Sequence, residues 1–149
     1  MLIDTIVANV NRKLADEMLT VSQLIEFMDE AINDINTNLC STFPTISEFE
    51  SNKANYSAYP DYNFFPNKYI QSVLIVGTAY KFYINDEEGM PTANQYGKDY
   101  QQNMYYMVRD YSDRVPAEYQ EDYRGMLFNQ HECPGFPKDN NMRGWFLDD

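Results

Sequence analysis

Apolar residues recur at the three- and four-residue spacing of a helix in four stretches of the sequence, and each stretch predicts one helix. The first covers residues 2–14 and the second covers residues 21–39, and each carries one apolar stripe. Acidic and amide side chains stand opposite the second stripe, which is typical of a solvated face. Thr20 and Gln23 have the spacing of a capping box, so we expect the second helix to begin directly after Thr20.

The third and fourth stretches are separated by a short acidic turn. The third, Tyr69–Ile84, follows Pro66, which suits the first helical position because its missing N–H costs nothing there. The fourth runs from Pro91 to Tyr111. Since the turn between them is short, we expect these two helices to be antiparallel neighbours.

The third stretch is apolar around almost its whole circumference. A surface helix of a small domain usually shows one apolar stripe, whereas a helix that is apolar all round is buried on several sides. Two interpretations fit. The helix is the centre of a compact bundle, or neighbouring subunits cover its second face. We expect the second arrangement, which makes the chain a building block of an assembly.

The remaining sequence is irregular and rich in aromatic residues. Residues 40–66 contain three prolines among Asn, Ser and Tyr, and this stretch predicts a long loop with room for a short hairpin. A short helix is expected over Pro116–Phe128, followed by a polar tail. The predicted fold is therefore mainly α, a bundle of about four helices in residues 1–112, with a loop insertion at residues 40–66 and an extended C-terminal arm at residues 113–149.

Charge and cysteine content narrow the classes of function. The chain has 149 residues and a formal net charge of −12, and it carries 13 tyrosines. Without a basic run, tight binding to nucleic-acid phosphates is not expected. Cys40 and Cys133 alone do not make a disulfide framework, which favours a reducing compartment. We also expect neither a signal peptide nor a membrane span.

The sequence holds few groups for catalysis or for metal binding. His131 is the only histidine, and closed zinc sites need four ligands. No glycine-rich phosphate loop or nucleophile elbow occurs. A Cys133–His131 nucleophile, or a glycosidase built on the acids of residues 86–88, stays open as a minor alternative. We therefore predict that the protein is not an enzyme and has no catalytic residues, no cofactor and no metal.

Taken together, the segments resemble the head-to-tail connector, or adaptor, proteins of tailed bacteriophages. The resemblance covers residues 20–112. It rests on the capped second helix with the sequence AINDI, the loop that ends in FFPNKY, the helix SVLIVGTAYKFY, the turn DEEG and the helix YGKDYQQNMYYMVRDY. It implies a helical bundle that forms a ring, commonly dodecameric, beneath the portal of the capsid and continues the DNA channel toward the tail.

The resemblance implies a virion protein that is assembled in the host bacterial cytoplasm. Its partners would be copies of itself, the portal protein and downstream tail or neck proteins, with DNA passing through without specific binding and no membrane contact. The predicted interface residues are aromatic or apolar side chains in the loop, the third helix and the arm: Tyr62, Phe64, Phe65, Ile75, Val76, Tyr83, Phe136, Trp145 and Phe146. The alternative is an acidic inhibitor that mimics DNA on a basic enzyme surface.

Overall fold

The computed structural model describes residues 1–14, 19–51, 61–85 and 90–121. Within these ranges the chain forms helices, turns and two isolated β-bridges. The elements in chain order are the α-helices α1 (Ile3–Lys13), α2 (Val21–Leu39), α3 (Ile46–Ser51) and α4 (Asn67–Tyr69), the π-helix η1 (Ile70–Ile75), the α-helices α5 (Val76–Ile84) and α6 (Met90–Tyr111), and the 3-10 turns η3 (Ser112–Arg114) and η4 (Ala117–Tyr119).

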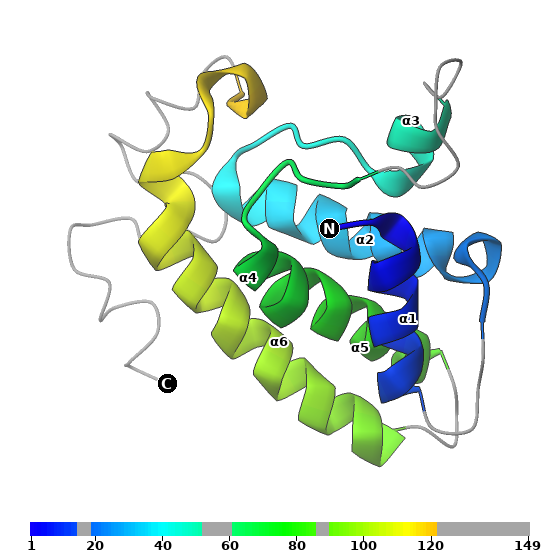
Figure 1. Ribbon diagram of the computed structural model, residues 1–149. Helices are drawn as coiled ribbons and strands as arrows, with labels where there is room; N and C mark the ends of the chain where they lie inside the picture. The colour runs from blue at the N-terminus through cyan, green and yellow to red at the C-terminus, as the bar shows by residue number, and fades with distance from the viewer. Residues whose placement is uncertain (15–18, 52–60, 86–89, 122–149) are drawn as a thin grey trace, which may run out of the picture.

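The bundle is arranged around one continuous helical rod formed by α4, η1 and α5. In Figure 1 this rod lies between α6 on one side and α1 on the other, with α2 behind it. All three surrounding helices contact the rod. The protein is therefore a helical bundle, and the prediction of a mainly α fold is confirmed.

The helix boundaries follow the predicted signals closely. α2 spans Val21–Leu39 as predicted, and Gln23 Oε1 accepts a hydrogen bond from Thr20 N at 2.9 Å, which satisfies one of the unpaired donors at the helix start. At the other end, Cys40 adopts a left-handed conformation with φ of 48°. Cys40 is disulfide-bonded, which the sequence analysis did not predict. Cys133 lies outside the described residues.

The sequence pattern predicts one regular helix here, whereas the middle section of the rod, Ile70–Ile75, is π-helical. The wider π turn alters which backbone carbonyls find a partner within the helix. Two side chains supply additional donors in this region. Thr78 Oγ1 donates to the Leu74 carbonyl at 2.8 Å, and Asn103 Nδ2 reaches across from α6 to the Ser72 carbonyl, also at 2.8 Å.

The Asn103 contact gives a testable prediction. Replacing Asn103 with alanine leaves the Ser72 carbonyl without this donor, so we expect the free energy of unfolding to fall by about 1–2 kcal/mol. Asn94→Ala is the matched control, because Asn94 lies exposed on the same helix and gains the same helix propensity. Denaturant unfolding of both variants measures the difference. Equal stability of the two variants would contradict the proposed role of Asn103.

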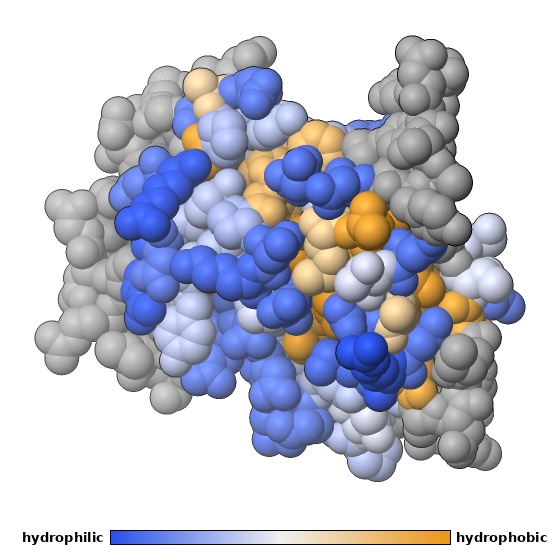
Figure 2. Space-filling model, viewed as in Figure 1, coloured by the Kyte–Doolittle hydropathy of each residue, from blue (hydrophilic) through white to orange (hydrophobic). Residues whose placement is uncertain are grey.

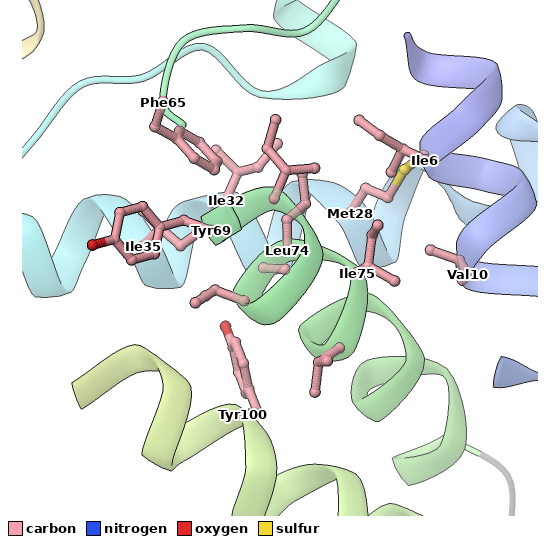
Figure 3. Packing of buried hydrophobic residues seen from close by; sticks show 14 of the residues in the cluster. Ile6, Val10, Met28, Ile32, Ile35, Phe65, Tyr69, Leu74, Ile75 and Tyr100 are labelled. Carbon is pink, nitrogen blue, oxygen red and sulfur yellow. The ribbon is translucent and has the colours of Figure 1, made fainter. Parts of the chain in front are cut away.

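The single chain buries Ile75, Val76 and Tyr83 of the rod, which corrects the expectation that other subunits cover these residues. Ile75 is 1% exposed, Val76 is 8% exposed and Tyr83 is 7% exposed. Figure 3 shows Ile75 pointing toward Val10 of α1 and Met28 of α2, while Leu74 faces α2. Three helices of this bundle thus bury most of the apolar side chains of the rod, and Ile84 at its end remains 39% exposed. The arrangement with a central helix in a compact bundle is the one that the structure adopts.

The loop insertion and the beginning of the predicted arm also lie against the bundle. Helix α3 occupies part of residues 40–66, and the described portions of this loop, residues 40–51 and 61–66, form no hairpin. After α6, Val115 is buried, and the Thr42 amide donates to the Tyr119 carbonyl at 2.7 Å. The only described part of the predicted helix over Pro116–Phe128 that is helical is the turn η4. Residues 122–149 of the arm lie outside the described residues.

Candidate interaction surfaces

The loop aromatics form a cluster inside the protein. We call this set the aromatic cluster, and its members come from three separate segments: Phe43, Tyr62, Phe64, Phe65 and Tyr119. Ring centroids lie 4.9 Å apart for Tyr62 and Phe64, 5.2 Å apart for Phe43 and Phe65, and 5.5 Å apart for Phe64 and Tyr119. Aromatic pairs at these distances attract each other beyond the area that they bury. The cluster therefore holds the loop to residues 117–119.

Hydrogen bonds fix the same loop to the first helix. The amino group of Met1 lies 2.6 Å from Asp61 Oδ1 and donates to the Tyr62 carbonyl at 3.0 Å and to Asn67 Oδ1 at 3.2 Å. The Tyr62 amide returns a hydrogen bond to the Met1 carbonyl at 2.8 Å. The Tyr62 hydroxyl donates to the Pro44 carbonyl at 2.7 Å. The loop is thus tied to α1 and to residue 44 within the same chain.

These contacts correct the prediction that Tyr62 and Phe65 face a partner. Tyr62 is 0% exposed and Phe65 is 3% exposed, because the aromatic cluster and α4 enclose them. Phe64 is half-buried, so part of its ring is accessible. The spacing of aromatic residues in the sequence identified a real cluster. It could not distinguish a cluster that closes on its own chain from one that awaits a partner.

Tyr83 has an internal role as well. Its hydroxyl donates to the Lys13 carbonyl at 3.0 Å, and the hydroxyl of Tyr96 lies 3.2 Å from the same carbonyl oxygen. The two rings stack with centroids 5.7 Å apart and an interplanar angle of 9°. Tyr83 and Tyr96 together fix the end of α1 to α5 and α6. With Ile75 and Val76 in the core, none of the three predicted interface residues of the rod is available to a partner in this fold.

The predicted interface residues of the arm, Phe136, Trp145 and Phe146, lie outside the described residues. Their contact with a partner stays a prediction. The acids of residues 86–88 and the pair Cys133 and His131 also lie outside the described residues.

A polar contact between three helices joins Asp34, Lys81 and Tyr100. The Tyr100 hydroxyl donates to Asp34 Oδ2 at 2.8 Å, and Lys81 Nζ lies 3.0 Å from the same oxygen. Burial, followed by the nearby Asp34 carboxylate, raises the pKa of the Tyr100 phenol far above its usual value. At neutral pH the phenol keeps its proton and donates it in the hydrogen bond. The group therefore links α2, α5 and α6, with each member paired to another.

An exposed aromatic surface lies on α6, and the sequence analysis did not predict it. We call it the α6 patch, and it consists of side chains from successive turns of the helix: Gln102, Tyr105, Tyr106, Arg109 and Asp110. Tyr106 is 38% exposed, and among the large apolar side chains of the described residues only Leu2 and Ile84 are exposed to a similar degree. In Figure 2 the visible surface over α6 is mainly hydrophilic, and the hydrophobic colour gathers between α6 and α1.

The side chains of the α6 patch hold one another in place. The Arg109 guanidinium lies 4.9 Å from the Tyr106 ring centroid and 5.7 Å from that of Tyr105. Gln102 Nε2 donates to the Tyr106 hydroxyl at 3.0 Å. Arg109 binds Asp110 through two hydrogen bonds of 2.8 Å and 3.0 Å, and these bonds are the largest cause that lowers the pKa of Asp110. The arginine is thereby preorganised beside two tyrosine rings.

A signal for the α6 patch was present in the sequence. Met104, Met107, Val108 and Tyr111 stand at helical spacing and form the apolar stripe of this helix, and all four are buried. Tyr105 and Tyr106 fall off that stripe, with Gln102 and Arg109 three or four residues away. Two tyrosines on the solvent side of a helix, next to an arginine, have the composition of an interaction surface.

The described residues offer no candidate metal site and no candidate membrane span. The described part of the chain contains no group of three or more histidine, cysteine or acidic residues that could hold a metal ion. Among the described helices, none is both long and apolar enough to cross a bilayer. Comparison with known proteins found no matching family model, no similar curated protein and no similar solved structure.

Proposed function

We propose that this protein is a structural adaptor of a bacteriophage neck, which joins the capsid portal to the tail as a closed ring. The observation that carries the proposal is the order of features in residues 20–112. These are the capped helix, the aromatic and proline-bearing loop, the apolar rod, the acidic turn and the long final helix. The resemblance to head-to-tail connectors implies a helical bundle, and the chain folds as one.

The proposal requires exposed contact surface, and the described residues offer it on α6. The rod does not provide this surface, because its apolar side chains are inside the bundle. The α6 patch has the tyrosine and arginine content of residues that dominate binding energy in interfaces. Its side chains already hydrogen-bond to one another before binding, which lowers the entropy cost of forming a contact.

The acidic character of the protein suits the lining of a channel through which DNA passes without being bound. A net charge of −12 repels a polyanion, so a ring of this protein would not retain DNA by counterion release. The DNA-mimic alternative needs carboxylates that are free to replace phosphates. Four acids of the described residues are already bound to groups of the same chain, since Asp29 binds Ser47, Asp34 binds Lys81, Asp61 binds Met1 and Asp110 binds Arg109.

The test is to co-express the chain with the portal protein encoded in the same genome. We expect one complex in which the portal carries a ring of this protein, visible by electron microscopy and with a mass, measured by light scattering, of several copies per portal. A chain of similar size and charge with an unrelated fold serves as the control for nonspecific association. A protein that stays monomeric and never binds portal would refute the proposal.

A further inference from the structure

We infer that the α6 patch binds the acidic outer face of α2 on a second copy of this chain. The inference rests on the proposed function, because it names the surfaces through which copies of the adaptor would meet. It draws on three observations, which are the exposure of the α6 patch, the sign of the charges around it and the composition of α2.

The surface around the α6 patch is basic, in contrast to the protein as a whole. Lys68, Arg109 and Arg114 all lower the pKa of Asp110, so their positive charges lie around this carboxylate. All three cations are exposed. Asp110 is the carboxylate that these three cations surround, and Asp113 follows it closely in the chain. The three cations outnumber these two carboxylates, on a protein of net charge −12.

The outer face of α2 has the opposite sign. α2 contains Glu26, Asp29, Glu30 and Asp34 and neither lysine nor arginine. Glu26 and Glu30 are four residues apart, and Asn33 and Thr37 continue the same stripe away from the core. Asp34 is bound to Lys81, and the two glutamates lie on the solvent side of the stripe. This face therefore fits a partner that presents an arginine.

The two surfaces belong to different sides of the bundle. α2 and α6 each pack on the rod, and Figure 1 shows α6 beside the rod and α2 behind it. A contact between different surfaces of identical copies is head-to-tail, and it gives a closed ring when the rotation between copies closes. Opposite charges also favour encounter of the α6 patch with the acidic face of α2, whereas two acidic faces repel each other. Because both surfaces belong to the same chain, the acidic face of α2 is always present at the same concentration as the α6 patch.

The test uses charge reversal in the full-length protein, with self-association measured by sedimentation velocity. We expect Arg109→Glu to weaken self-association about tenfold or more, because it places a carboxylate opposite the acidic face. Tyr106→Ala is expected to have a similar effect. Combining Arg109→Glu with Glu30→Arg is expected to restore association. Lys98→Glu is the matched control, since it also replaces a positive charge with a negative one at an exposed position of α6.

Each other outcome decides against the inference in a different way. If the wild-type protein assembles and Arg109→Glu has no effect, the α6 patch is not the contact, and the proposed adaptor function stands. If the double variant does not regain association, α2 is not the partner surface. If Arg109→Glu blocks binding to portal but leaves self-association intact, the α6 patch binds portal and not a second copy of this chain. If the wild-type protein neither self-associates nor binds portal, both proposals fail. Thermal unfolding of each variant confirms that it is folded.

Discussion

Gly77→Ala is expected to lower the free energy of unfolding by about 2 kcal/mol, even though alanine is the better helix former. A Cβ atom added at Gly77 would lie 2.6 Å from Cε1 of the Tyr100 ring. That ring cannot easily move away, because it is buried between α5 and α6 and its hydroxyl is bound to Asp34. Relief of the clash requires the two helices to separate. Urea unfolding monitored by circular dichroism measures the loss.

Gly97→Ala is the matched control for this variant. A Cβ atom at Gly97 would lie 2.9 Å from Cε1 of the Tyr80 ring, so the two glycines make reciprocal contacts between α5 and α6. Tyr80 is only partly buried and its ring can shift toward solvent. The gain in helix propensity then offsets much of the clash, and we expect the change to stay within about 1 kcal/mol. A Gly97→Ala variant that is the less stable of the two would show that this account of the crossing is wrong.

Tyr62→Ala is expected to have the larger effect, a loss of about 3–5 kcal/mol in the free energy of unfolding. Tyr62 is 0% exposed, its ring contacts Phe64 and Phe65, and its hydroxyl binds the Pro44 carbonyl. The substitution removes the central ring of the aromatic cluster and leaves a cavity. The measurement is chemical unfolding of the isolated protein at a concentration low enough to keep it monomeric.

Two controls separate packing from other effects in this experiment. Tyr62→Phe keeps the ring and removes the hydrogen bond to Pro44, and it should cost about 1–2 kcal/mol. Tyr106→Ala removes an exposed tyrosine and should change monomer stability by less than about 0.5 kcal/mol. If Tyr62→Ala left the monomer as stable as the wild-type protein, Tyr62 would be a surface residue, as the sequence first suggested.

The helices could be predicted because their signals are local. The apolar stripe of α2 and the spacing of Thr20 and Gln23 set its boundaries, and Pro91 lies in the first turn of α6. The π turn at residues 70–75 could not be predicted in this way. It depends on packing across the bundle, such as the contact from Asn103 to Ser72, and such contacts leave no periodic trace in the sequence.

The candidate surfaces were harder to predict, because an apolar residue looks the same whether its own chain or a partner buries it. Ile75 and Tyr83 were assigned to an interface on the argument that a small domain could not enclose the whole rod. The structure shows that α1, α2 and α6 suffice. Tyr106 lies away from the buried stripe of α6, where the apolar periodicity carries no signal, and it remains accessible.

The paired glycines and tyrosines of α5 and α6 have a mechanical consequence. The Tyr100 ring lies against Gly77 and the Tyr80 ring lies against Gly97, so sliding either helix along its axis drives a ring into the backbone of the other helix. Tension applied to the outer side of α6 is therefore resisted in shear at two positions along the crossing. The same load then reaches α2 through Tyr100 and Asp34. We therefore expect α5 and α6 to move together under load, without bending at their crossing.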